Sequence, residues 1–98
     1  MHVSIWKFTG DPDELTRGYD ALAEERPADQ FIVNLCLRAP DGIVVVDTCP
    51  TREDFEAFST SEEFRAARMR HGMPDPTELH DYPVHAAFIN GTTAPVTG

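Results

Sequence analysis

The amino-acid sequence predicts an α+β fold in which a four-stranded antiparallel sheet carries two helices on one face. Three observations support this prediction. A β-rich segment near the start is followed by a helix signal, two further β-rich runs flank an Asp-Gly turn, and a second helix signal precedes a last alternating segment. The resulting order, β-α-β-β-α-β, is that of the ferredoxin-like arrangement, or split βαβ unit.

The first two elements are a strand and a helix. Residues 2–8 alternate β-branched or aromatic side chains with polar ones and end before Gly10, which is typical of a strand. Asp11 and Pro12 then supply an N-cap and a proline at the first helical position. Apolar residues follow at helical spacing, namely Leu15, Tyr19 and Leu22, and Pro27 ends the pattern.

The next two elements form a hairpin. Residues 31–37 and 43–48 are β-rich, and Asp41-Gly42 between them is a strong turn signal. With Asp41 and Gly42 as the central turn residues, we expect the facing pairs Leu37 with Val46, Leu35 with Thr48, and Cys36 with Asp47.

The remaining elements are a second helix and a last strand. The helix begins near Thr51 and is interrupted around residues 59–61, where Thr60 and Glu63 offer a second capping box. Gly72 ends this helix. We expect a last strand over residues 82–89, so residues 1–90 form one domain and residues 91–98 a flexible C-terminal tail.

Alternation along the strands separates two sheet faces. One face is aliphatic, and we expect it to form the core: Val33, Leu35, Leu37, Val44 and Val46. The other face mixes polar with apolar residues, among them Trp6, Ile32, Val45 and Ile89, and is too apolar to leave in water. A chain of 98 residues also buries little of its surface. We therefore expect a homodimer.

Charge and composition narrow the range of partners and compartments. The formal net charge is −9, which opposes binding to nucleic acid and to anionic membranes. No apolar run approaches the roughly 20 residues of a membrane span, and the first residues lack a signal-peptide pattern. We expect a cytoplasmic protein. Its two cysteines, Cys36 and Cys49, are too few for a disulfide framework.

Two segments carry a resemblance to a known family. They are IVVVDTCPTREDFEAFSTSEEFRAA, residues 43–67, and HGMPDPTELHDYPVHAAFI, residues 71–89. With the element order, they resemble the dimeric α+β barrel superfamily, which includes antibiotic biosynthesis monooxygenase-like proteins and small polyketide cyclases. The resemblance implies a dimer with a pocket between sheet and helices. The chain departs from many relatives at Cys49 and Thr51, where those carry Trp and Ser, and it lacks the proximal His of the haem-degrading branch near Arg68.

Seven polar or aromatic residues are candidates for the site. Ser4, Trp6, Asn34 and Cys36 share the mixed face as substrate-binding residues. His85 is the candidate general acid or base, oriented by Asp47, with Tyr82 as a hydrogen-bond donor to a developing enolate. The structural alternatives are a half-buried strand histidine bonded to a carbonyl, and a tyrosine that anchors its strand with its ring. The four histidines lack metal-ligand spacing, so we expect no metal.

These observations favour a cofactor-independent enzyme that oxygenates, cyclises or isomerises an aromatic or polyketide-like molecule by proton transfer. The alternative is a non-catalytic dimeric module that binds a small molecule or is associated with stress. An enzyme should have an open pocket lined by His85 and a second polar group. An interface should be closed and filled by Trp6, Ile32 and Val45.

Overall fold

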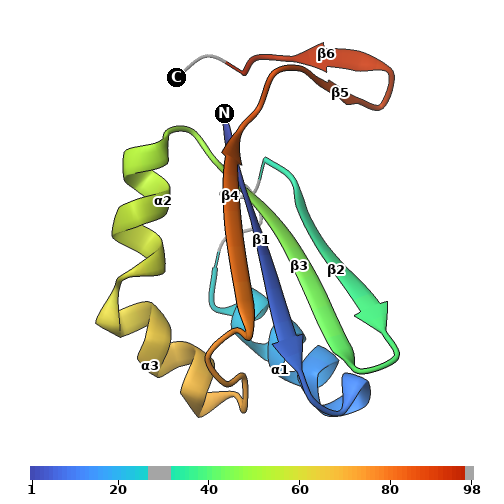
Figure 1. Ribbon diagram of the computed structural model, residues 1–98, viewed down its shortest axis with the longest axis vertical. Helices are drawn as coiled ribbons and strands as arrows, with labels where there is room; N and C mark the ends of the chain where they lie inside the picture. The colour runs from blue at the N-terminus through green and yellow to red at the C-terminus, as the bar shows by residue number, and fades with distance from the viewer. Residues whose placement is uncertain (27–31, 97–98) are drawn as a thin grey trace.

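The computed structural model describes residues 1–26 and 32–96 of the chain (Figure 1). Within these residues a four-stranded antiparallel sheet has the order β2-β3-β1-β4, which is compatible with a ferredoxin-like fold and confirms the predicted α+β class. The elements are β1 (His2–Thr9), α1 (Pro12–Glu24), β2 (Asn34–Ala39), β3 (Gly42–Cys49), α2 (Arg52–Ser59), α3 (Glu62–Arg70), β4 (Glu78–Pro83), β5 (Ala87–Ile89) and β6 (Thr92–Ala94).

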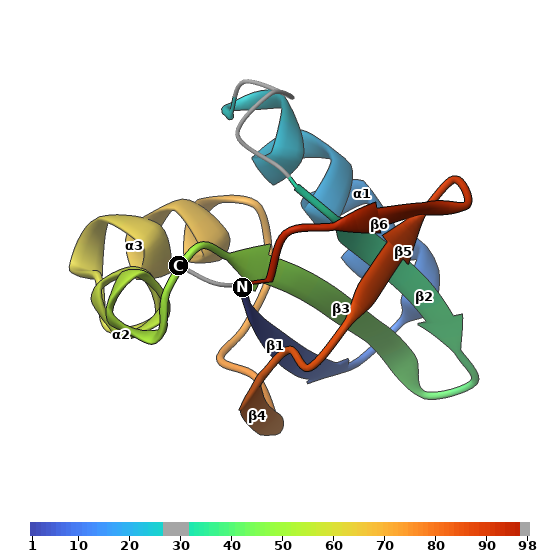
Figure 2. The ribbon, with the colours of Figure 1, turned by 90° about the horizontal axis from the view of Figure 1, so that it is seen from above.

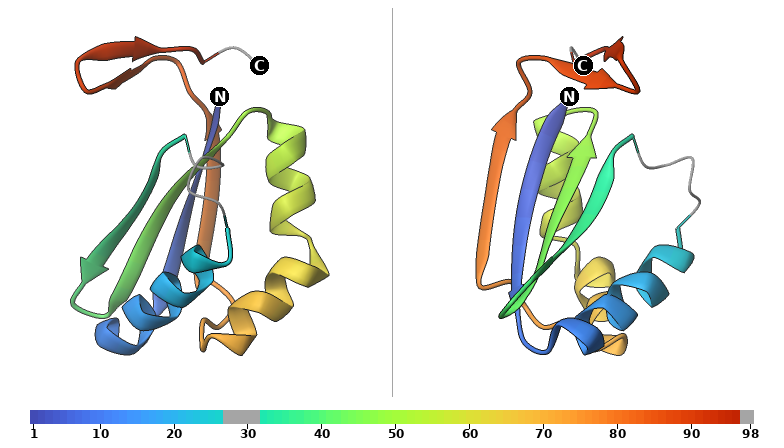
Figure 3. Two further views of the ribbon diagram at one scale, coloured as in Figure 1. Left: turned by 180° about the vertical axis from the view of Figure 1, so that it is seen from behind. Right: turned by 90° about the vertical axis from the view of Figure 1, so that its right-hand side faces the viewer.

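The helices α1, α2 and α3 all lie on one side of the sheet, and the opposite side is open (Figures 2 and 3). Their starts follow the capping signals of the sequence. The side chain of Asp11 accepts a hydrogen bond from the backbone N–H of Asp13, and Thr51 accepts one from Asp54. The interruption of the second helix is confirmed, but Ser61 is the N-cap of α3, whereas we expected Thr60.

The hairpin forms with a register two residues away from the predicted one. Ala39 faces Gly42, so Pro40 and Asp41 occupy the turn and Gly42 belongs to β3. A Cβ atom on Gly42 would lie 1.9 Å from the carbonyl oxygen of Phe8, which explains why a glycine stands here. The true pairs are therefore Leu35 with Val46, Cys36 with Val45, and Leu37 with Val44. Because the shift is even, each side chain stays on its predicted side of the sheet.

The assignment of the two faces to core and surface was wrong. The helices cover the mixed face, where Trp6, Phe8, Ile43 and Val45 are buried. The aliphatic face that we expected in the core is the open one, and Leu35 and Leu37 are 49% and 48% exposed there.

Aromatic packing explains this choice of face. Helices α2 and α3 contribute Phe58 and Phe64, whose ring edges meet the Trp6 ring at centroid distances of 6.2 and 5.8 Å. Such edge-to-face pairs add about 0.5–1.5 kcal/mol each beyond the area they bury. Helices that carry aromatic residues are therefore matched to the face that carries the tryptophan.

The C-terminal region also differs from the prediction. The expected strand over residues 82–89 is divided, because β4 ends at Pro83 and β5 begins at Ala87. Asn90 and Gly91 have φ of 53° and 75°, the backbone conformation that a tight hairpin turn requires, and they connect β5 to β6. Thr92–Ala94, which we placed in a flexible tail, thus form a strand. No helix in residues 1–26 and 32–96 is long and apolar enough to cross a membrane.

Replacing Gly18 by alanine tests how closely α1 approaches the segment after α3. A Cβ atom at position 18 would lie 2.5 Å from the carbonyl oxygen of His71. Helix propensity alone predicts that Gly18→Ala stabilises the protein by about 0.5–1 kcal/mol. We expect the opposite sign, a loss of about 1–3 kcal/mol from overpacking, measured by urea unfolding. The exposed control Arg17→Ala should change little, and a more stable Gly18→Ala protein would contradict the packing described here.

Candidate functional site

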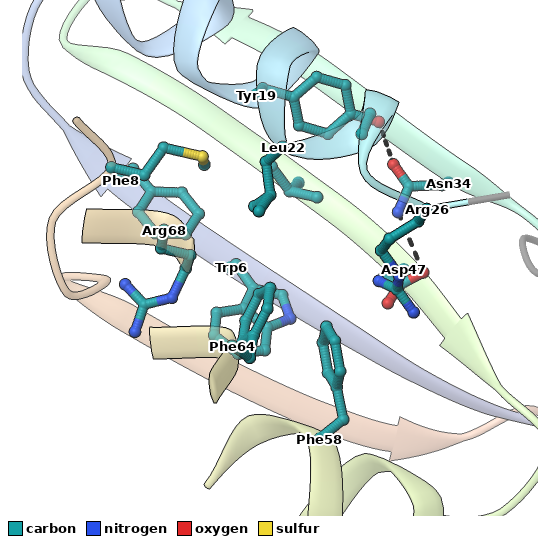
Figure 4. Close-up of a pocket in the computed structure, with 13 residues that line it drawn as sticks. Trp6, Phe8, Tyr19, Leu22, Arg26, Asn34, Asp47, Phe58, Phe64 and Arg68 are labelled. Carbon is teal, nitrogen blue, oxygen red and sulfur yellow. Dashed lines mark hydrogen bonds between the residues drawn. The ribbon is translucent and has the colours of Figure 1, made fainter. Parts of the chain in front are cut away.

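A cavity of about 50 Å³ lies between the sheet and helices α1, α2 and α3 (Figure 4). Its walls are mainly apolar, with polar groups at two ends. This combination is characteristic of small-molecule sites, although such sites usually measure about 300–1,000 Å³. The lining residues are Trp6, Phe8, Tyr19, Leu22, Ala23, Arg26, Asn34, Val45, Asp47, Phe58, Phe64, Arg68 and Met73.

A hydrogen-bonded chain of three side chains forms one end of the cavity. The Tyr19 hydroxyl donates to Oδ1 of Asn34, and Nδ2 of Asn34 donates to Oδ1 of Asp47 at 3.0 Å. Asp47 is only 6% exposed. Neighbouring strands create this contact, because Asn34 on β2 faces Asp47 on β3. The chain fixes the orientation of the Asn34 amide and holds a carboxylate against an apolar cavity.

Of the three hydrogen-bonded side chains, Tyr19 is the one that we did not predict as a site residue. We counted it as an apolar helix position. Burial raises its pKa above the ordinary value of 10.0, and the nearby Cys36 and Asp47 raise it further. Tyr19 therefore keeps its proton at neutral pH and acts as a donor. The sequence did place Tyr19 on the buried side of the helix. Because a buried tyrosine hydroxyl usually has a hydrogen-bond partner, this position could have identified it.

Aromatic side chains make the middle of the cavity. Phe58 and Phe64 lie 4.1 Å apart between ring centroids and close the side opposite the sheet. Trp6 forms the floor, and its indole Nε1 donates to Oγ of Ser4 at 2.9 Å. The guanidinium carbon of Arg26 lies 4.7 Å from the Phe58 ring centre, and Figure 4 shows Arg26 at the Asp47 end. Aromatic rings thus form most of the wall in the middle of the cavity.

Arg68 forms the other end of the cavity, on the far side of Trp6 from Asp47 in Figure 4. It is 4% exposed. Its Nη1 donates to the carbonyl of Pro74 at 2.7 Å, and its Nη2 donates to Asp75 at 3.3 Å. Its Nε is buried and has no hydrogen-bond partner among the described residues. A buried donor left without a partner costs about 1–3 kcal/mol, so this nitrogen is exceptional.

The structure brings together some of the predicted site residues. Trp6, Asn34 and Asp47 line the cavity, and Ser4 lies directly beneath it as the partner of Trp6. Cys36 is half-buried on the same face but is not part of the lining. Burial raises the thiol pKa of both Cys36 and Cys49, so neither is activated as a nucleophile.

His85 and Tyr82 lie away from this cavity. We expected His85 on the mixed face beside Asp47, but it is exposed in the bend between β4 and β5. The reason is that β4 ends at Pro83, two residues before His85, so the strand alternation does not reach His85. Tyr82 faces Val3 and is on the open side of the sheet. Neither residue contributes to the lining.

A histidine that we did not select forms a buried contact on the same side of the sheet. Nε2 of His2 lies 2.6 Å from Oδ2 of Asp81, which joins β1 to β4. The side chain of His2 is 5% exposed and packs near the Phe55 ring. Residues 1–26 and 32–96 contain no group of three His, Cys, Asp or Glu side chains placed to hold a metal ion.

No model of a known protein family matches the chain, and no curated protein matches it significantly. The resemblance to the dimeric α+β barrel superfamily therefore remains an expectation from the sequence motifs.

Alkaline titration of Tyr19 checks that it is buried beside the carboxylate. In the Tyr82→Phe protein, Tyr19 is the remaining tyrosine. We expect its phenolate absorbance to appear above pH 10, because burial disfavours the ionised form. The raised pKa makes ionisation oppose folding, so stability should be retained below pH 10 and fall as the pH rises through the folded pKa. A midpoint at or below pH 10 would show that Tyr19 is solvated.

Proposed function

We propose that this protein is a cofactor-independent enzyme that removes a proton from an aromatic or polyketide-like substrate bound in the cavity. The observation that supports this proposal is the buried carboxylate of Asp47 at the polar end of an aromatic cavity. A carboxylate that is held in place by a hydrogen bond beside a bound substrate is positioned to act as a general base. In this proposal Asp47 takes the catalytic position that we expected for His85, which lies outside the cavity.

The neighbouring side chains have distinct roles in the proposed reaction. A C–H or phenolic O–H bond of the substrate breaks, its proton moves to the Asp47 carboxylate, and the electron pair stays on the substrate as an enolate or phenolate. Asn34 holds the carboxylate in place through its 3.0 Å hydrogen bond, and Tyr19 orients Asn34. The ring of Trp6 supports the flat substrate. Isomerisation, cyclisation and oxygenation of such molecules can all start from this proton transfer.

Substrate binding requires the cavity to widen. Its 50 Å³ is far below the about 300–1,000 Å³ of typical small-molecule sites. Phe58 and Phe64 form the wall opposite the sheet, and Phe58 lies against Arg26. Rotation of these rings is the local movement that would admit a substrate ring without separating the helices from the sheet.

Replacing Asp47 by asparagine tests the proposed base. The probe is 1-tetralone, an aromatic ketone with an acidic C–H beside its carbonyl, whose exchange with D₂O is followed by NMR. We expect the wild-type protein to accelerate this exchange and Asp47→Asn to reduce the acceleration by about 100-fold or more, because a positioned general base contributes about 10²–10⁴-fold.

The matched control is Asp20→Asn, an exposed carboxylate next to Tyr19 on α1. It should exchange 1-tetralone at the wild-type rate. Wild-type protein that does not accelerate the exchange, or an Asp47→Asn protein as active as wild type, would overturn the proposed base.

We also propose that two copies of the chain pair through their open sheet faces, as in dimeric α+β barrels. The open face carries a contiguous aliphatic surface over β1, β2 and β3, made by Val3, Ile5, Leu35, Leu37, Val44 and Val46. Monomeric proteins rarely leave such a patch in water. A second copy would cover it without disturbing the helices or the cavity, which lie on the other side.

A charged residue in the open face tests the dimer. Light scattering should give a mass near twice the 10.9 kDa of one chain. Leu37→Glu should shift the mass toward a monomer, because the dimer would have to bury a carboxylate. The control Met69→Glu, at an exposed position on α3, should remain dimeric. A monomeric wild-type protein at micromolar concentration would exclude this pairing.

The small cavity favours a second function, a non-catalytic dimeric module. In that case the aromatic side chains of the cavity serve as a core, and Asp47 serves to fix the β2–β3 pairing through Asn34. Dimerisation with no exchange of 1-tetralone by the wild-type protein would support this function over the enzyme.

A further inference from the structure

We infer that the ligand of the cavity is a planar molecule with an anionic oxygen, and that the Nε–H of Arg68 binds this oxygen. The inference rests on the proposed function, since it assumes that the cavity takes a small molecule. It adds the class of ligand, an aromatic carboxylate or phenolate, and the group that recognises it.

Of the three guanidinium nitrogens of Arg68, only Nε has no hydrogen-bond partner among the described residues. The terminal nitrogens bind the Pro74 carbonyl and Asp75, which both belong to the segment between α3 and β4. Figure 4 shows these terminal nitrogens turned away from Trp6, with Nε as the guanidinium nitrogen nearest to it. The side chain is 5% exposed, and Nε has no partner in residues 1–26 and 32–96. A rigid, buried N–H beside a cavity is suited to an acceptor oxygen of a ligand.

The charge of the cavity supports an anion. The chain as a whole has a formal charge of −9, yet Arg68 places a buried positive charge at one end of the cavity, and the Asp47 carboxylate lies at the opposite end. The carboxylate of Asp75 is shared by Arg68 and Arg65, so it does not fully compensate the charge of Arg68. A positive charge at this end of the cavity favours an anionic ligand over a neutral molecule of the same shape.

The position of Arg68 relative to Asp47 sets how such a ligand would lie. Arg68 and Asp47 are at opposite ends of the cavity, with Trp6 between them (Figure 4). A ligand oxygen at Arg68 therefore places the opposite edge of its ring toward Asp47 and Asn34. Phe64, which lies 5.3 Å from the Arg68 guanidinium carbon, covers this end. The ring rotation that widens the cavity also uncovers Nε.

Binding of matched anionic and neutral probes tests the inference. Benzoate and 2-naphthoate are compared with benzamide and 2-naphthamide, which have the same shape without charge, by NMR titration of the full chain. We expect each carboxylate to bind at least tenfold more tightly than its amide. Arg68→Met should remove this preference, and Arg68→Lys, which keeps the charge but lacks Nε–H, should weaken carboxylate binding by about three- to tenfold.

The matched control is Arg65→Met, because Arg65 shares Asp75 with Arg68 but does not line the cavity. It should bind benzoate within twofold of wild type. Circular dichroism checks that each variant is folded. If Arg68→Met does not fold, Arg68→Lys alone provides the test. Equal binding of carboxylates and amides, or unchanged carboxylate affinity in Arg68→Lys, would overturn the inference. The cavity would still be a site that binds small molecules. If none of the four probes binds the wild-type protein, the inference and the cavity as a ligand site both fail.

Discussion

The alternation of side chains along β1 and β3 is the constraint on which the rest of this structure depends. On one side of the sheet it places Trp6 next to Val45 and Ser4 next to Asp47. The helices then cover this side, because their phenylalanines match its tryptophan. A carboxylate is buried by the same arrangement and must be held by donors, which Asn34 and, through it, Tyr19 provide. The core and the candidate site are therefore a single structure.

The same alternation leaves the chain with an aliphatic surface that its own helices do not cover. Leu37 and Val44 face each other across β2 and β3 on this side, away from the cavity. A protein of 98 residues has few other ways to bury more apolar area. Pairing of two sheets and binding of a ligand would thus use opposite faces, and a change on one face should leave the other intact.

Local signals in the sequence predicted most of the fold. Asp11, Thr51 and Gly72 mark helix ends because they act through their own backbone or nearest neighbours. The choice between the two sheet faces was not predictable in this way, because both faces are apolar and the choice depends on which one fits the helices. His85 was misplaced because alternation was extended past Pro83.

The candidate site was predictable only in part, for a related reason. Trp6, Asn34 and Asp47 follow from strand parity, so they were identified correctly as neighbours on one face. Arg68 could not be identified, because a helix arginine is normally solvated and its burial here depends on the segment around Pro74.

A proton NOE spectrum of the wild-type protein shows most directly which face of the sheet the helices cover. The structure predicts NOEs between the Trp6 indole and the rings of Phe58 and Phe64. NOEs from the methyl groups of Leu37 or Val44 to Leu15 of α1, with none from Trp6 to the phenylalanines, would contradict it.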